Sequence, residues 1–223
     1  MACRKFPQQT TMMMIKNSLL IAFFIITCTI SFAQHRDAGT WIGAGISYDL
    51  SKDISLDINE EMRYNISVAD LYQLNSNISF SYKFTKKIKV GIDYRYSVRE
   101  SVDVNRVGCS LTLREGVKDF DFSIRSKIQY SFIPDRQEGS AWRNKGTIKY
   151  EVTKKLTPYF SAELFYAFSN DIDQFDNYRL ETGMRWELNK HHELNPFFLY
   201  DQEFQVNAPE ILNVFGLSYV YKI

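Results

Sequence analysis

The sequence of 223 residues has few of the side chains that build disulfide frameworks, metal sites or catalytic centres. It contains three cysteines and three histidines, with only 5 prolines and 10 glycines. Cys3 and Cys28 precede the expected cleavage point of a leader, so Cys109 alone remains afterwards and no internal disulfide can form. The histidines fall in a polar lead-in and in one short turn, away from convergent partners. The sequence therefore predicts no metal, no cofactor and no histidine-dependent triad.

Long hydrophobic runs are also scarce. The apolar run at residues 18–30 has 13 residues and follows Lys16. It is too short for a membrane-spanning helix, which needs about 20 residues, and it has the form of a secretory signal. Small residues at the end of this run place cleavage after Ala33. We therefore expect a signal peptide at 1–33 and a single barrel domain at 34–223.

Two alternatives concern this leader. The residues before the apolar run are unusual for a signal, and translation from Met12, Met13 or Met14 is an alternative start. A lipoprotein cleaved before Cys28 is the competing interpretation of the apolar run. Thr27 is a poor residue to precede a lipid-modified cysteine, so we favour the secretory signal.

The chain also lacks an excess of either charge. Its formal net charge is +1, and removing the leader leaves 24 basic against 26 acidic residues. This balance gives no reason to expect a nucleic-acid partner, and the sequence contains no glycine-rich phosphate loop. The overall hydropathy is slightly polar, which excludes a helical membrane protein but not a membrane barrel, whose strands are half polar.

What the sequence has in quantity is strict alternation of apolar and polar residues. Between residues 72 and 84, and again between 88 and 98, every second residue is Leu, Ile, Val, Phe or Tyr, with Ser76 as one break. Two such runs joined by a polar turn at 85–87 predict an antiparallel hairpin. Each run is about twice the usual strand length of roughly 5–6 residues, and it matches the roughly 9–11 residues that cross a bilayer as a tilted strand.

Alternation continues through the chain, together with a repeat of turns. Short turns surround Lys52, Lys86, Lys154 and Lys190, and a fifth lies near Lys118. The interval of roughly 31–37 residues corresponds to one hairpin plus a longer loop. Short turns at one end and longer loops at the other are typical of outer-membrane barrels.

Three features predict that the apolar faces point to lipid. A closed barrel of this size has no room inside for so many large apolar side chains. Aromatic residues gather near the ends of runs, for example Tyr64, Tyr96 and Trp142, as in the aromatic girdles of membrane barrels. The last run ends at Ile223 within an amphipathic strand, which is similar to the signal that the outer-membrane assembly machinery recognises.

These patterns predict an all-β fold, an antiparallel up-and-down transmembrane β-barrel of about 10–12 strands. We count eleven runs but favour twelve strands, because single-chain bacterial barrels have even strand numbers. The expected location is the outer membrane of a Gram-negative bacterium. The expected partners are the lipid bilayer and, through the C-terminal strand, the assembly machinery.

Several strand and turn segments resemble a family of small Gram-negative envelope barrels. These segments are the end of the signal at 32–34, the early Trp41, the turn at 50–52, the strand segment 56–64, and the segment 82–87 with the following 91–96. The family is catalogued as a domain of unknown function, number 2490, and the resemblance covers about residues 38–223. It implies an outer-membrane β-barrel, and it carries no activity and no catalytic residues.

The polar strand faces carry charges of both signs, and we expect these charges to line the lumen. The predicted lumen residues are Glu61, Arg63, Arg95, Arg125, Lys127, Lys145, Glu151, Glu163, Arg179, Glu181, Arg185, Glu187, Asp201 and Glu203. We also expect the basic residues at 125–149 to pair across the lumen with the acids of the strands that follow.

Two functions are compatible with such a lumen. We favour a barrel closed by its own salt bridges, with a structural or binding role. The alternative is a charged, porin-like channel that selects small solutes. An outer-membrane enzyme acting on lipid or glycan is the least favoured class, since acids such as Glu181 and Glu187 are common on one strand face, and we expect no enzymatic activity.

Overall fold

The computed structural model describes residues 37–99, 102–133, 139–168 and 173–223. Every regular element in these ranges is a β-strand. No helix among the described residues is long and apolar enough to cross a membrane. The expected signal peptide, its alternative start sites and His35 lie outside the described residues.

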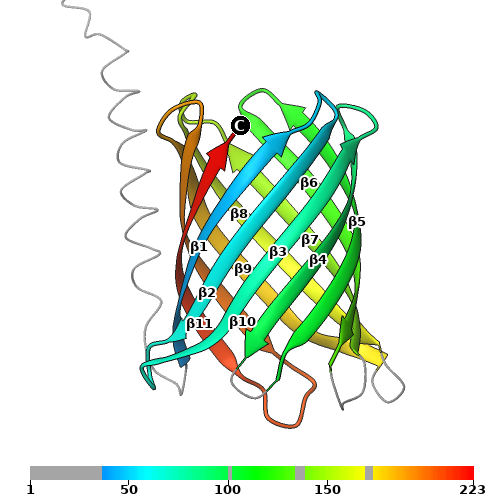
Figure 1. The fold of residues 1–223 in the computed structure, drawn as a ribbon, viewed down its shortest axis with the longest axis vertical. Coiled ribbons are helices and arrows are strands. Elements are labelled where there is room, and N and C mark those ends of the chain that lie inside the picture. The colour runs from blue at the N-terminus through cyan, green and yellow to red at the C-terminus, as the bar shows by residue number, and fades with distance from the viewer. Residues whose placement is uncertain (1–36, 100–101, 134–138, 169–172) are drawn as a thin grey trace, which may run out of the picture. The chain divides into compact units, whose positions relative to one another are not determined.

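Eleven strands in the described residues close into one barrel (Figure 1). In chain order they are β1 (Asp37–Asp49), β2 (Ile54–Asn65), β3 (Asp70–Lys83), β4 (Ile88–Arg99), β5 (Val104–Val117), β6 (Phe120–Phe132), β7 (Gly139–Tyr150), β8 (Leu156–Phe168), β9 (Asp173–Glu187), β10 (His192–Glu203) and β11 (Ile211–Lys222). Strands of 12 residues, as in β2, to 15 residues, as in β9, are long enough to cross a bilayer at a tilt. The predicted all-β transmembrane barrel is confirmed.

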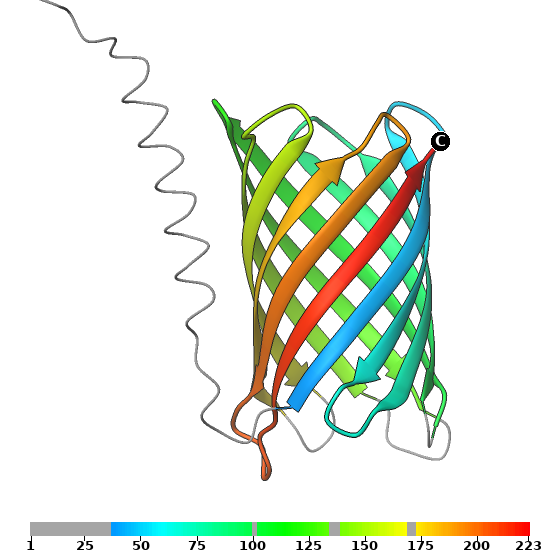
Figure 2. The same ribbon diagram turned by 90° about the vertical axis from the view of Figure 1, so that its left-hand side faces the viewer.

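The barrel closes through one parallel pair of strands. β1 lies beside β11 in parallel register, whereas every other neighbouring pair is antiparallel (Figure 2). The favoured count of twelve strands is therefore wrong, although eleven lies within the predicted range. An odd number of strands leaves the first and last ones pointing the same way. A parallel ladder still pairs the backbone groups of both edges, so closure needs no twelfth strand.

The connections fall into two sets at opposite ends of the barrel (Figure 1). The turn end, where β11 finishes, has connections 50–53, 84–87, 118–119, 151–155 and 188–191. The loop end, where β1 starts, has connections 66–69, 100–103, 133–138, 169–172 and 204–210. The difference in length is smaller than predicted, because the strands extend into the expected loops. Unpaired backbone N–H and C=O groups are costly in a bilayer, so strand pairing is favoured over irregular loops near the membrane.

Side-chain oxygens cap four of the five turns at the turn end. Ser51 Oγ accepts hydrogen bonds from the backbone N–H groups of residues 53 and 54 at 3.3 and 3.1 Å. Thr85, Thr153 and Asn189 cap their own turns in the same way. In the fifth turn Lys118 adopts a φ of 55°, in the left-handed region. The lysine repeat in the sequence thus marks turns that a preceding polar residue stabilises.

The two faces of the sheet are inverted relative to a soluble protein. Outward Ile92 is 58% exposed, whereas inward Asn75 is 1% exposed. Soluble proteins bury their large apolar side chains. An outer apolar band suits contact with lipid acyl chains, as the alternation predicted.

A small apolar cluster interrupts the polar lumen. Trp41, Leu199 and Val214 are buried together, with Phe197 and Leu212 packed against them. These residues come from β1, β10 and β11, so the cluster lies beside the parallel closure. It supplies the one apolar core of the described interior.

Tyr72 is the residue whose face the alternation misplaces. Strict period two puts it outward with Leu74, but the pairing of β2 with β3 shifts register between Arg63 and Tyr64. Tyr72 is the extra residue of β3 at this shift, between the partners of Arg63 and Tyr64. Its hydroxyl accepts a hydrogen bond from Nε1 of inward Trp41 at 3.0 Å.

Candidate functional site

The lumen is lined by alternate residues of every strand, because inward and outward positions alternate along each one. The predicted lumen residues lie at inward strand positions, with Glu151 as the exception. Glu151 follows β7 in the turn 151–155 and is exposed. Glu203 ends β10 at the loop end, where its carboxylate accepts a hydrogen bond from the backbone N–H of Glu210 at 3.3 Å.

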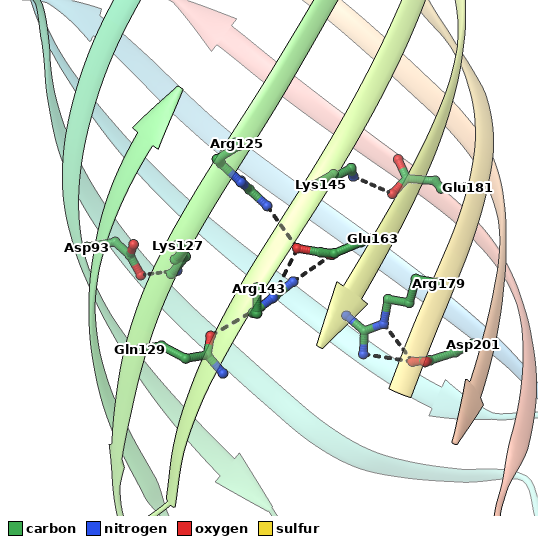
Figure 3. Close-up of polar contacts among 10 residues, drawn as sticks. All are labelled: Asp93, Arg125, Lys127, Gln129, Arg143, Lys145, Glu163, Arg179, Glu181 and Asp201. Carbon is green, nitrogen blue, oxygen red and sulfur yellow. Dashed lines mark hydrogen bonds and ion pairs between the residues drawn. The ribbon is translucent and has the colours of Figure 1, made fainter. Parts of the chain in front are cut away.

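Glu163 on β8 is the most deeply buried carboxylate of the described lumen, at 6% exposed. Arg143 donates to both of its oxygens, from Nε at 3.0 Å and from Nη2 at 2.8 Å (Figure 3). Arg125 adds a third contact from Nη2 at 3.3 Å. Two guanidinium groups thus compensate one buried carboxylate, which makes Glu163 the best-satisfied charge of the site.

Three further ion pairs lie on the lumen wall. They are Lys145 with Glu181 at 2.9 Å, Lys127 with Asp93 at 2.7 Å and Arg179 with Asp201 at 2.7 Å (Figure 3). Each pair joins adjacent strands or strands with one strand between them. The basic residues Arg125, Arg143 and Lys145 do pair with acids of the strands that follow, as expected. The expected path across the lumen is wrong for these pairs, because tilted neighbouring strands already bring opposite charges together along the wall.

Glycines allow some of these side chains to lie flat on the wall. A Cβ atom added at Gly108 would lie 2.5 Å from Cε of Lys127, whose chain crosses β5 to reach Asp93. A Cβ atom added at Gly183 would lie 2.6–2.8 Å from the phenol group of Tyr159. That tyrosine donates its hydroxyl proton to the carboxylate of Glu181 at 2.6 Å. A larger residue at either glycine would push these side chains toward the lumen axis.

Charged side chains at the turn end remain in contact with water. Lys222 pairs with Glu187 at 3.4 Å and with Glu193 at 2.6 Å, yet the side chains of Lys222 and Glu187 are 37% and 34% exposed. Arg185 on the same inward face is exposed to a similar extent. Glu187 and Lys222 are the last residues of β9 and β11, so their exposed surface lies at the turn-end mouth of the lumen.

Arginines stack on aromatic rings in the loop-end half of the lumen. The guanidinium carbon of Arg63 lies 3.7 Å from the ring centre of Trp41, and that of Arg179 lies 5.6 Å from it. Arg143 and Arg179 lie 4.5 and 4.8 Å from the ring centre of Phe165. Cation–π contacts of this kind hold the long side chains in fixed positions. They fix Arg63, Arg143 and Arg179 over aromatic rings in this half of the lumen.

The family model described as "Protein of unknown function (DUF2490)" matches residues 38–211. The chain belongs to this family. No curated protein is significantly similar to it in sequence. The match agrees with the resemblance in the strand and turn segments.

The barrel is similar in fold to solved outer-membrane porin structures. The NanC porin has a TM-score of 0.50 and 9% identity, covering 74% of this chain and 86% of that one. The KdgM porin has a TM-score of 0.47 and 14% identity, covering 70% and 81%. A loop L8 deletion mutant of OmpT, an outer membrane protein of Vibrio cholerae, has a TM-score of 0.42 and 9% identity, covering 71% and 60%. Identities this low establish the fold alone.

In this member of the DUF2490 family, the inward face also carries Arg99 and Arg106, which are not among the fourteen predicted lumen residues. Arg99 ends β4, and Arg106 is the third residue of β5. Their signal in the sequence was parity, the alternation of strand faces in which every second residue points the same way: Arg99 shares a face with Arg95, and Arg106 with Arg114. What parity could not reveal is which of these arginines has a carboxylate within reach.

The described part of this DUF2490 chain contains no group of three or more His, Cys, Asp or Glu side chains that could hold a metal ion. Cys109 is exposed on the outward face of β5. His192 Nδ1 lies 2.6 Å from the hydroxyl of Tyr219, at the turn end of β10.

Proposed function

We propose that this barrel is a small-solute channel of the outer membrane. The observation that carries the proposal is the path of the lumen ion pairs, which run along the wall between nearby strands. Ion pairs that closed the lumen would reach across its axis, and the described lumen ion pairs join only adjacent strands or strands with one strand between them. Lys222 and Glu187, which end β11 and β9 at the turn-end mouth, keep 37% and 34% of their side-chain surface exposed. Charged walls with water between them are the arrangement that a solute-selective pore needs.

The fold supports the same proposal. An apolar outer band on a closed ladder suits a bilayer, and the NanC porin shares the fold with a TM-score of 0.50. We place the mature protein in the outer membrane, with residues 1–33 removed after Ala33. The strand that ends the barrel, β11, is the segment that the assembly machinery would recognise.

A closed barrel with a structural or binding role is the second candidate. Inward Asn75, Ser161 and Glu163 are almost completely buried. Such packing narrows the loop-end half of the lumen. A barrel blocked there would bind a solute from one mouth without conducting it.

Conductance in planar bilayers separates the two candidates. The refolded wild type should insert and give steady ohmic steps that grow with salt concentration. Thr147→Trp places a large ring at an inward position of β7 and should lower the step size. Ile148→Trp, on the adjacent outward position, is the matched control and should leave the step unchanged. A correctly folded wild type that never conducts would refute the channel.

Location and processing have their own test. The mature protein should fractionate with the outer membrane, and mass spectrometry should find its N-terminus at Gln34. An acylated N-terminal Cys28 would replace the secretory signal by a lipoprotein signal.

A further inference from the structure

Three inward arginines on neighbouring strands have no carboxylate bonded to them among the described residues. We call Arg95, Arg99 and Arg106 the arginine triad. Arg95 pairs in register with Arg106 across β4 and β5, and Arg99 lies four residues further along β4. Like charges at paired positions on one sheet face repel each other.

The carboxylates near Arg95 are already engaged. Glu61 accepts from Arg63 Nε at 2.8 Å and from Asn75 at 3.0 Å. Asp93 accepts from Lys127 at 2.7 Å. The arginine triad therefore adds positive charge to a wall whose nearby acids already have basic partners.

The surroundings of Arg106 are the most one-sided. The charged groups that act on it most strongly are Arg95, Arg143, Arg99 and Arg63. Among the described residues its side chain makes one hydrogen bond, from Nε to Ser131 Oγ at 3.0 Å. Both terminal nitrogens of the guanidinium group are thus left available to an acceptor from solution.

Other lumen arginines show what the arginine triad lacks. Arg143 and Arg125 share Glu163, and Arg179 is bonded to Asp201. A charge that is partly removed from water is tolerated when an opposite charge accompanies it. The acids nearest to Arg95 already have basic partners, and no acid is among the strongest electrostatic neighbours of Arg106. A mobile anion is therefore a source of the compensation that these two lack. Arg99 is exposed where β4 ends and adds positive charge at the mouth.

We infer that the arginine triad is a binding site for a small oxyanion, the carboxylate or phosphate group of a solute that enters from the loop end. Guanidinium groups match such anions with two parallel hydrogen bonds. The triad faces the lumen, which excludes lipid headgroups as the source. Arg99 and Arg106 flank the connection 100–103, so the site lies near the loop-end mouth. The inference rests on the proposed function only in that the lumen must admit solute from that mouth.

Ligand-dependent stability tests the site without requiring conduction. The refolded barrel is unfolded with urea in phosphate, in succinate and in sodium chloride of equal ionic strength. Phosphate or succinate should raise the unfolding midpoint of the wild type. Arg106→Gln should weaken the response at least about tenfold in Kd, the loss expected for one charge-assisted contact. The ligand with the lower Kd identifies the oxyanion.

The matched control is Lys89→Gln. Lys89 lies on the same inward face of β4, six residues from Arg95 and about 20 Å away along the strand. The Lys89→Gln substitution removes one positive charge, as Arg106→Gln does, and should leave the response to phosphate and succinate intact. Arg106→Gln should also be more stable than the wild type in chloride alone, because the repulsion within the arginine triad is relieved. An undiminished oxyanion response in Arg106→Gln overturns the site.

Reversal potentials across a salt gradient connect the site to transport. The conducting wild type should prefer chloride over potassium, and Arg95→Gln with Arg106→Gln should reduce that preference more than Lys89→Gln. A channel that conducts but neither prefers anions nor responds to oxyanions overturns the arginine triad and leaves the channel. A barrel that binds phosphate or succinate without conducting overturns the channel and leaves the triad.

Discussion

Ile78 offers the sharpest test of which face of the barrel meets lipid. It lies near the middle of β3, is exposed on the outer face, and has outward Ile58 and Tyr94 as its cross-strand partners. An arginine at the bilayer midplane of a barrel costs about 2–4 kcal/mol. Because 1.4 kcal/mol is tenfold, Ile78→Arg should reduce the folding equilibrium constant roughly 30-fold to 700-fold.

Ser79 is the matched control for this substitution. It is the next residue of β3, points inward, and has Asp57 and Asp93 as its cross-strand partners. Ser79→Arg would place a positive charge between two carboxylates, so its effect should stay within about 1 kcal/mol. Urea-dependent folding into lipid vesicles, followed by tryptophan fluorescence and heat-modifiable gel migration, measures both variants. Equal losses, or a larger loss at Ser79, would show that the faces are assigned the wrong way round.

Three further substitutions test the wall and the turns. Gly183→Ala should lower single-channel conductance, because its Cβ would displace the tyrosine ring that lies over it; Gly146→Ala, where the added Cβ meets nothing within 4 Å, should not. Glu163→Gln should destabilise the barrel in urea titrations by about 3 kcal/mol, since it leaves two guanidinium groups without their carboxylate. The control for Glu163→Gln is Glu115→Gln, which breaks the exposed ion pair of Glu115 with Lys87 and should change stability by less than about 1 kcal/mol. Lys118→Gly should raise the free energy of unfolding by about 1 kcal/mol, because glycine adopts φ of 55° without strain, and an unchanged or lower urea midpoint would contradict this reasoning.

Local chemistry made most of the fold predictable. Alternation at residues 72–98 identified β3 and β4 and their outward faces, because a pleated strand places successive side chains on opposite sides whatever its neighbours are. The polar residue before each turn lysine works within its own turn, as Ser51 does with residues 53 and 54. For the same reason parity alone put Glu163, Arg125 and Lys127 on the inward face.

The candidate site was less predictable because it depends on contacts between strands. Parity places Arg125 and Glu163 inward but says nothing about their 3.3 Å contact across an intervening strand. It also cannot separate Arg143, which has a carboxylate, from Arg106, which has none bonded. Strand tilt and stagger in the closed barrel set those distances.

The sequence by itself determined the strands, the turns and the two faces, since each follows from a few consecutive residues and from the solvent on either side. Only the tertiary structure decided that β1 closes on β11, that a register shift turns Tyr72 inward, and that ion pairs follow the wall. These outcomes depend on how eleven strands stagger when the sheet closes. Closure brings together residues far apart in the chain, and no local pattern encodes the distance between them.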